Sequence, residues 1–192
     1  MKKKILYVIS SGRSGSTLLC KFLGMHSQCF ALSEPQRYDM ATRTNGFCSC
    51  SETLLDCQFW GAVRFKLEAA GYEGGRMDTS QFPFYKGKSF LRKFQAFLGL
   101  FLFAKGFGKL IDKGYYQQLC NEAKLLQTVS IVSDKPVLVD ASKSLVRAIG
   151  LSRLLKDDYE SHFIHLYREP VSVVYSSLKK NMSVKLEDRE IV

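Results

Sequence analysis

The sequence predicts a three-layer α/β protein with a mostly parallel sheet of four or five strands. The prediction depends on one local pattern that occurs three times: a short apolar run, a turn, and then apolar residues at helical spacing, which is typical of βα units on a parallel sheet. The chain has 192 residues, of which 46% are hydrophobic. That length and composition suit a single domain over residues 1–192, with helices on both faces of the sheet.

Each repeat of the pattern supplies one strand and the helix that follows it. The expected strands are 4–9, 136–140 and 162–167, and their helices are 16–24, 144–156 and 170–180. Pro170 suits the first turn of its helix, because the N–H that proline lacks would have no helical partner there. A fourth, weaker strand is expected at 29–32, directly before Ser33-Glu34-Pro35.

The segment from about 36 to 130 interrupts this rhythm. Its periodicity is poor, so we predict a helical and loop insertion over one end of the sheet, where α/β proteins place their ligands. Its apolar stretch at 90–110 is broken by lysines, Arg92 and glycines and is too interrupted to span a bilayer. We expect a core helix or a cap there, and peripheral contact with a membrane surface through 90–110 remains the alternative.

The net charge and the cysteine content indicate which kinds of binding partner and which cellular compartment to expect. The net charge of +10 favours an anionic partner such as a nucleotide, an acidic substrate or a phospholipid surface. The chain lacks the interleaved basic and aromatic residues of a nucleic-acid site, so we expect no nucleic-acid partner. Six irregularly spaced cysteines and an N-terminal apolar run too short for a secretory leader predict a cytoplasmic protein with reduced thiols. No pattern specifies an oligomeric state.

The turn after the first strand is built like a phosphate cradle. Backbone amides of a glycine-containing loop and the following helix N-terminus together attract an anion. The candidate binding residues are Ser11, Gly12, Arg13, Ser14, Gly15, Ser16 and Thr17. Compared with a nucleotide-binding P-loop, Ser16 replaces the lysine and Arg13 supplies the positive charge instead. The alternative is that this segment is only a flexible turn.

Two motifs together resemble the sulfotransferases that use 3′-phosphoadenosine 5′-phosphosulfate (PAPS). Residues 11–19, with the core Arg-Ser-Gly-Ser-Thr, resemble the 5′-phosphosulfate loop of that family, and residues 166–176 are similar to its 3′-phosphate motif. The resemblance implies a P-loop-type sulfotransferase fold, PAPS as co-substrate without a metal, and a 3′-phosphate bound by Arg168 and Ser176. Arg168 offers bidentate charge-assisted donors. The alternative is that Arg168 pairs with Glu169 or Glu160 and that Ser176 is solvated.

The resemblance also implies two further catalytic residues beside Arg13. Glu34 lies where some family members carry a general base for the acceptor hydroxyl, and Lys143 lies where others carry a lysine that stabilises the leaving phosphate. The alternative for Glu34 is a helix cap at Pro35 or an ion pair with Arg37. We interpret Asp140 as a structural residue. The alternative is that the apolar strand ending in Asp140 corresponds to the strand that carries the metal-binding carboxylate of a nucleotide-hydrolysing enzyme.

Three cysteines of the insertion, Cys48, Cys50 and Cys57, are similar to a Cys-rich stretch of bacterial family members. Zinc with a fourth ligand such as Cys29 or His26 is one interpretation, but the C-x-C and C-x6-C spacing differs from that of common zinc ribbons. A disulfide or free thiols fit the spacing better. The sequence prediction is therefore that the protein holds no metal.

The predicted activity is transfer of a sulfuryl group from PAPS to a hydroxyl of a carbohydrate, glycolipid or small-molecule acceptor. One alternative is a kinase or other NTPase that binds Mg-ATP through Thr17 and Asp140. A second is a nucleotide-binding remnant without catalysis. Family members commonly continue well beyond the 3′-phosphate helix, whereas this chain ends sixteen residues after Ser176. We therefore expect a shortened member or an incomplete chain.

Overall fold

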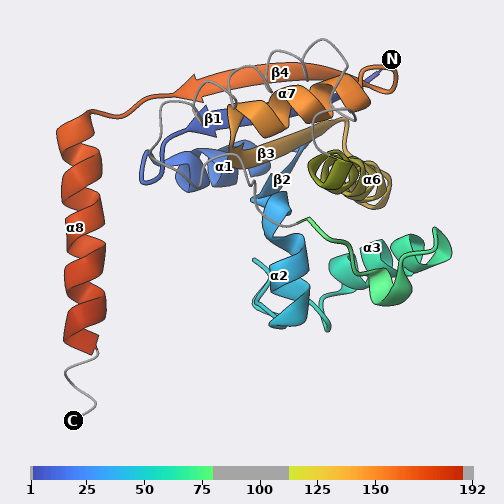
Figure 1. The fold of residues 1–192 in the computed structure, drawn as a ribbon, viewed down its shortest axis with the longest axis horizontal. Helices are drawn as coiled ribbons and strands as arrows, with labels where there is room; N and C mark the ends of the chain where they lie inside the picture. Colours follow the sequence, from blue (N-terminus) through green and yellow to red (C-terminus); the bar gives the residue numbers. More distant parts are fainter. Residues whose placement is uncertain (1, 80–112, 188–192) are drawn as a thin grey trace.

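Four parallel strands form the centre of the protein, as a computed structural model describes it for residues 2–79 and 113–187, with side chains as far as Lys179 (Figure 1). The spatial order is β2-β3-β1-β4, and every neighbouring pair is parallel. The strands are β1 (Lys3–Ser10), β2 (Cys29–Ser33), β3 (Val137–Lys143) and β4 (Tyr159–Leu166). The α/β prediction with a parallel sheet is therefore confirmed.

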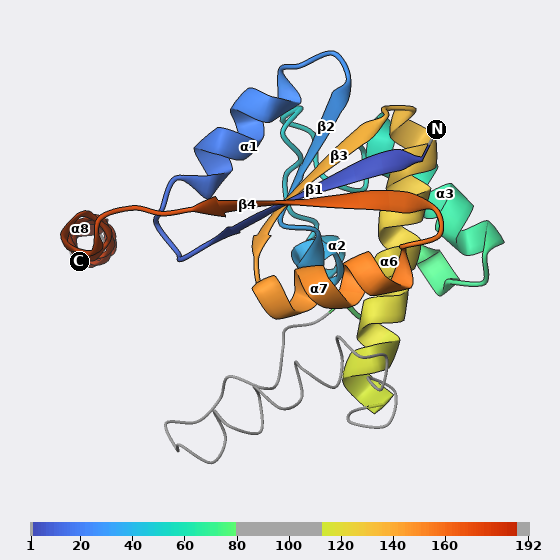
Figure 2. The same cartoon turned by 90° about the horizontal axis from the view of Figure 1, so that it is seen from above.

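Helices connect and flank these strands (Figures 1 and 2). The α-helices are α1 (Ser16–Gly24), α2 (Tyr38–Arg43), α3 (Gln58–Ala69), α6 (Lys113–Ser133), α7 (Leu145–Leu154) and α8 (Pro170–Glu187). Two single turns of 3-10 helix, η1 (Pro35–Arg37) and η2 (Glu73–Gly75), complete the described elements. The expected amphipathic segment at 90–110 lies outside the described residues.

The two faces of the sheet have separate cores. On one face Val8, Val139 and Ala141 pack against Cys20 of α1. The other face has the larger core, in which strand residues meet side chains from α3, α6 and α7. The most buried members of that core include Ile5, Tyr7, Val63, Leu67, Leu119, Leu125, Leu126, Leu138 and Leu151. Helices on both sides of a sheet buried in this way complete the three layers.

Helices α3 and α6 of the insertion lie against this larger core, whereas η1 and α2 directly follow the carboxyl end of β2. Helix α3 contributes Val63 and Leu67, both fully buried, and α6 packs beside α7. Helix α6 runs through Ser133, so the insertion ends slightly later than the predicted boundary near 130. Burial of these apolar side chains stabilises this placement, because the sheet face would otherwise remain exposed.

Two strands are longer than their sequence pattern indicates. β3 continues through Ala141, Ser142 and Lys143, which the sequence analysis assigned to a turn, and β4 begins at Tyr159 instead of His162. β3 is paired on both sides, so the ladder extends through small residues that have little strand preference of their own. His162 and His165 are exposed, because β4 is an edge strand with part of its surface uncovered.

Helix α8 extends away from the sheet at the end of β4 (Figures 1 and 2). Its side chains Val171, Val174, Tyr175 and Leu178 recur at helical spacing and are all exposed. The third predicted βα unit therefore forms its strand and its helix, but its helix does not cover the sheet as the first two helices do.

Candidate functional site

The carboxyl ends of all four strands meet at one edge of the sheet, and each end leads into a segment that the sequence analysis selected. In spatial order, β2 is followed by Glu34, β3 ends at Lys143, β1 enters the loop 11–15, and β4 is followed by Arg168. The register places Ile9 beside Lys143 and Ser10 beside Leu166. This edge is where ligands bind in open α/β sheets.

The loop 11–15 has an open, amide-rich conformation. Gly15 has φ 93° at the N-cap of α1, a left-handed value that favours glycine. A Cβ at Gly12 or Gly15 would meet no atom within 4 Å. No side chain of the described residues caps α1, and its first turn carries no acidic residue. The N-terminus of α1 is therefore uncapped and lies beside open space at both glycines, an arrangement that suits an anion.

The hydroxyl groups of this loop have different roles. Ser14 is buried, and its hydroxyl donates to the Ser11 carbonyl (2.7 Å) and shares a 2.6 Å hydrogen bond with the Ser11 hydroxyl. Ser16 is buried at the start of α1, whereas Thr17 is exposed. The Ser11–Ser14 contacts order the turn, which leaves backbone amides as its main donors toward a ligand.

Three residues from the two sequence motifs are in direct contact. Arg168 Nη1 donates to the Arg13 carbonyl (3.1 Å), and Arg13 Nε donates to the Ser176 hydroxyl (3.1 Å). Arg13 Nη2 also donates to the Ser176 carbonyl (3.3 Å). Residues separated by 155 and 163 positions in the chain thus form one cluster. Both guanidinium groups are exposed, so the cluster presents positive charge to solvent beside the loop.

Glu34 contacts two cations. One carboxylate oxygen pairs with Lys143 Nζ, and the other pairs with Arg37 Nε at 2.7 Å. An ion pair with Arg37 is the alternative to catalysis that the sequence leaves open for Glu34, and the structure contains it together with the Lys143 pair. The side chain of Glu34 does not cap the 3-10 turn at Pro35. The two predicted catalytic residues of β2 and β3 are therefore brought together, both partly buried at 19% and 26% exposure.

Three residues of this edge have left-handed backbone conformations without being glycine. Arg13 has φ 64°, Ser33 has φ 60° and Lys143 has φ 69°, and they lie at or just beyond the ends of β1, β2 and β3. Such residues cost roughly 1–2 kcal/mol each and are found mainly where a functional geometry requires them. Among the described residues, three of the six non-glycine residues with positive φ lie at these adjacent strand ends, which is compatible with a site at this edge.

Two hydroxyls at the same edge were not selected by sequence reasoning. Ser10 Oγ and Ser142 Oγ are buried without a hydrogen-bond partner among the described residues. They lie on neighbouring strands, just before the loop and just before Lys143. A buried hydroxyl without a partner is costly, so these groups are available to a ligand or water. Serine is too common at strand ends for its position alone to give this signal.

Asp140 belongs to a different, buried cluster with Arg147 and Glu122. Arg147 Nη1 donates to Asp140 at 2.6 Å, and Arg147 Nε pairs with Glu122. The second carboxylate oxygen of Asp140 accepts from the Ser142 amide at 2.9 Å. Burial, with the nearby negative charge of Asp140, raises the pKa of Glu122 to about 7, although the Arg147 guanidinium opposes the rise. Asp140 is 1% exposed and engaged in these contacts, which is compatible with the structural role that the sequence favours.

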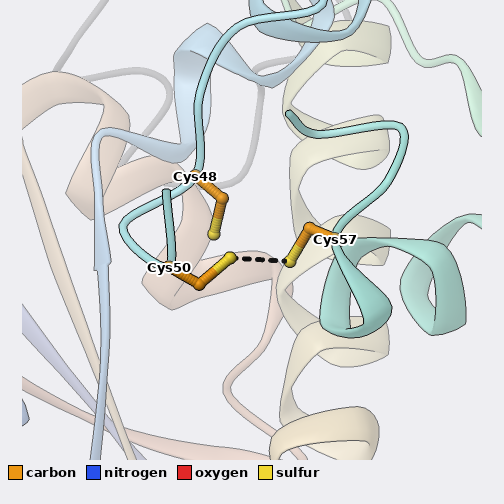
Figure 3. A group of neighbouring side chains, drawn as sticks. All are labelled: Cys48, Cys50 and Cys57. Carbon is orange, nitrogen blue, oxygen red and sulfur yellow. Dashed lines mark hydrogen bonds between the residues drawn. The ribbon is translucent and has the colours of Figure 1, made fainter. Parts of the chain in front are cut away.

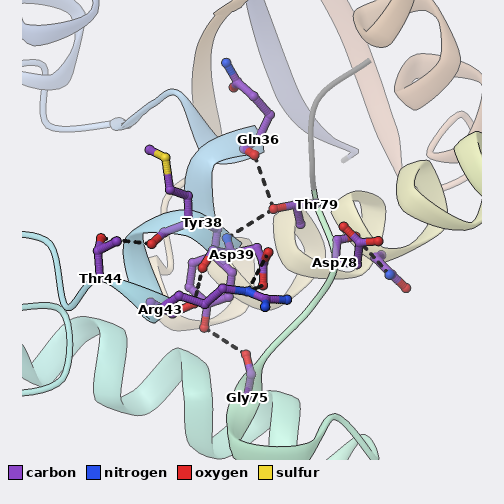
Figure 4. A network of polar contacts seen from close by, with 11 residues as sticks. Gln36, Tyr38, Asp39, Arg43, Thr44, Gly75, Asp78 and Thr79 are labelled. Atoms are coloured by element: carbon purple, nitrogen blue, oxygen red, sulfur yellow. Dashed lines mark hydrogen bonds and ion pairs between the residues drawn. The ribbon is translucent and has the colours of Figure 1, made fainter. Parts of the chain in front are cut away.

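A separate pocket of about 720 Å³ lies in the insertion, between α2, α3 and the segment around η2. Hydrogen bonds hold its walls (Figure 4): Arg43 pairs with Asp39 at 3.0 Å, the Asp39 amide donates to Thr79, and Tyr38 donates to the Gly75 carbonyl. Burial raises the pKa of Tyr38 to about 12, so its hydroxyl stays protonated as a donor. The pocket carries both signs of charge from arginines and carboxylates.

No disulfide links any of the six cysteines, all of which lie in the described residues. Cys48, Cys50 and Cys57 lie together, with their sulfurs within 4.8 Å of one another. Neither Cys29 nor His26 joins them: Cys29 opens β2, and His26 Nδ1 accepts a hydrogen bond from the Gln28 amide at 3.2 Å.

Comparison of the chain with protein families, with curated proteins and with solved structures finds no match. In the described ranges, no helix combines the length and apolar character needed to cross a membrane. The functional assignment therefore depends on the geometry of the site and the motifs of the sequence.

Proposed function

We propose that this protein transfers a sulfuryl group from PAPS to a hydroxyl of a carbohydrate, glycolipid or small-molecule acceptor. The observation that carries the proposal is the contact between the glycine loop and the distant 3′-phosphate motif, through Arg13, Arg168 and Ser176. A nucleotide with phosphate groups at both the 5′ and 3′ positions needs two anion sites at a fixed separation. The loop amides supply one site, and Arg168 with Ser176 supplies the other.

The hydrogen bonds of the cluster suit a second phosphate. Ser176 accepts from Arg13 and keeps its own proton to donate to a phosphate oxygen. Arg168 uses Nη1 toward the Arg13 carbonyl, which leaves the rest of its planar fork for bidentate binding. This pairing of donors is a reason to prefer a 3′-phosphorylated nucleotide over ADP or ATP.

The reaction needs a base for the acceptor hydroxyl, the electrophilic sulfur of PAPS, and positive charge near the phosphate oxygen that leaves. The acceptor hydroxyl oxygen forms a bond to sulfur while the bond between sulfur and the 5′-phosphate oxygen breaks. Glu34 takes the hydroxyl proton, and adenosine 3′,5′-bisphosphate leaves with the negative charge. Lys143, in contact with Glu34, stabilises that charge together with Arg13. Arg37 holds the other oxygen of Glu34 and orients the carboxylate.

The Mg-ATP alternative is weaker because its metal carboxylate is already in use. Asp140 is buried and bound to Arg147 and to the Ser142 amide. A P-loop enzyme normally holds magnesium with the loop hydroxyl and such a carboxylate. Sulfuryl transfer does not need that metal, so the occupied Asp140 is compatible with the proposed reaction.

Calorimetric titration with and without magnesium tests the proposal. We expect adenosine 3′,5′-bisphosphate to bind without metal and at least about 10-fold more tightly than ADP, because charge-assisted hydrogen bonds contribute about 1.5–3 kcal/mol. Arg168→Ala should erase this preference. Arg153→Ala is the control, since Arg153 lies near the C-terminal end of α7, toward the opposite edge of the sheet.

Tighter binding of Mg-ATP than of the bisphosphate would overturn the proposal. A sulfate-transfer assay with PAPS and a panel of hydroxyl acceptors then separates an enzyme from a binding remnant. The pocket between α2 and α3 belongs to the insertion, the segment that we expect to select the acceptor.

A further inference from the structure

Three cysteine side chains of the insertion point toward one another (Figure 3). Cys48 and Cys50 lie in a turn closed by the antiparallel bridge between Phe47 and Thr53, and Cys57 is the N-cap of α3. The three sulfurs lie within 4.8 Å of one another, and Cys50 and Cys57 are 3.6 Å apart. No other His, Cys, Asp or Glu among the described residues joins this group.

The sulfur separations fit a shared metal ion better than a disulfide. A disulfide joins two sulfurs at about 2.05 Å and leaves a third thiol unused. Zinc binds thiolates at about 2.3 Å in a tetrahedron, so two sulfurs on one ion lie roughly 3.8 Å apart. The 3.6 Å between Cys50 and Cys57 is close to that edge. The Cys48 sulfur lies within 4.8 Å of both of them.

The backbone around the cysteines holds this arrangement. The Cys48 amide donates to the Glu52 carbonyl (2.8 Å), the Ser51 amide donates to the Cys48 carbonyl (3.0 Å), and the Cys57 amide donates to the Thr53 carbonyl (2.9 Å). Ser51 has φ 75°, a left-handed conformation that tightens the turn. Between α2 and α3, residues 44–57 form no helix or strand beyond the single bridge. Irregular segments of this length are uncommon inside a compact domain.

We propose that Cys48, Cys50 and Cys57 bind one zinc ion as thiolates, with water in the fourth position. Cys57 is buried and Cys50 is exposed, so the ion lies at the surface with one side open to solvent. Binding releases the thiol protons and fastens the 44–57 segment to the N-terminus of α3. The site is independent of the sulfuryl transfer proposed above, because it shares no residue with the carboxyl edge of the sheet.

Titration of the reduced 192-residue chain with Co²⁺, followed by Zn²⁺, tests the site. We expect one Co²⁺ per chain, with intense visible bands of tetrahedral cobalt and a sulfur-to-cobalt charge-transfer band that zinc abolishes. Native mass spectrometry should then show one zinc per chain. Cys50→Ser, at an exposed position, should weaken binding by at least about 100-fold, since loss of a ligand exceeds the loss of an outer contact.

Cys29→Ser is the matched control and should bind cobalt as the wild-type chain does. Cys48→Ser provides a second test, which avoids the buried Cys57 and its effect on folding. The proposal fails if the reduced chain takes up less than one metal ion, or if Cys50→Ser and Cys48→Ser bind as tightly as the control. It also fails if binding requires Cys29.

Discussion

Strand β3 carries two charge clusters with opposite compositions. At its end, Lys143 joins Arg37 on the single carboxylate of Glu34, so two cations surround one anion. Within the strand, Asp140 joins Glu122 on the single guanidinium of Arg147, so two anions surround one cation. The first cluster has 19–54% exposed side chains, and the second has at most 5%.

The difference in burial decides what each cluster can do. The buried cluster is desolvated, so its charges depend on one another and hold β3, α6 and α7 in place. The edge cluster stays in contact with solvent, where each ion pair adds little stability and the charges remain available to a ligand. Ion pairs between carboxylates and basic side chains therefore have a structural role inside the core, whereas at the edge of the sheet they are suited to chemistry.

The largest expected effect is the loss of Arg147. Arg147→Met keeps most of the side-chain volume but leaves Asp140 and Glu122 buried without a cation, so we expect the free energy of unfolding to fall by about 3–5 kcal/mol. Arg37→Met in the edge cluster is the matched variant and should cost no more than about 1 kcal/mol. Urea denaturation measures both, and equal losses would contradict the distinction between the clusters.

The second effect concerns the edge cluster and the proposed reaction. Glu34→Gln removes the base, so we expect sulfuryl transfer to fall by about 100- to 10,000-fold, or about 3–5 kcal/mol in barrier. Nucleotide affinity should change less than twofold. Glu160→Gln on β4 serves as a control carboxylate. Transfer that persists in Glu34→Gln would assign the proton to another group.

The third effect is a pH dependence in the buried cluster. The pKa of Glu122 is raised to about 7 in the folded state, so the folded protein binds a proton that the unfolded chain releases at lower pH. Stability should therefore fall as pH rises from 5 to 8, by about 2 to 3 kcal/mol from this group. Glu122→Gln should flatten the change. A wild-type stability that rises over this range would show the opposite sign.

The smallest effect tests the strained strand ends. Ser33 has φ 60°, and glycine adopts this conformation without the steric cost. Ser33→Gly should therefore stabilise the fold by up to about 1 kcal/mol, less the greater entropy that glycine adds to the unfolded chain. Leu32→Gly, one residue earlier in the strand, should destabilise it instead. Thermal denaturation at one pH measures both variants, and a loss of stability in Ser33→Gly would show that Ser33 is not strained.

Local patterns predicted most of the elements of the fold. The strand at β1, the loop 11–15 and the helix α1 were predicted almost to the residue, because apolar spacing and glycine act over a few neighbours. The end of β3 was missed, since Ala141, Ser142 and Lys143 extend through pairing with two other strands. The placement of α8 was missed too, because helical spacing shows which face is apolar and not what covers it.

The candidate site likewise has features that the sequence predicted and features that it missed. The sequence indicated Arg13, Glu34, Lys143 and Arg168 as residues at the ends of strands, each from its own segment. It gave no sign of the unpaired Ser10 and Ser142 hydroxyls. For the three cysteines it left zinc, a disulfide and free thiols as alternatives, and it did not show that all three sulfurs meet. Those features depend on neighbours far away in the chain or on the path of an irregular loop.

By itself the sequence determined the βα units, the glycine turn and the residue types at the strand ends, because short-range sterics and apolar periodicity act within each segment. Only the tertiary structure decided the strand order, which places Glu34 against Lys143 across 109 residues and Arg168 against the Arg13 loop. It also decided which charged side chains are buried away from solvent. Contacts of this range form only when a shared core brings distant segments together, so they leave no periodic trace along the chain.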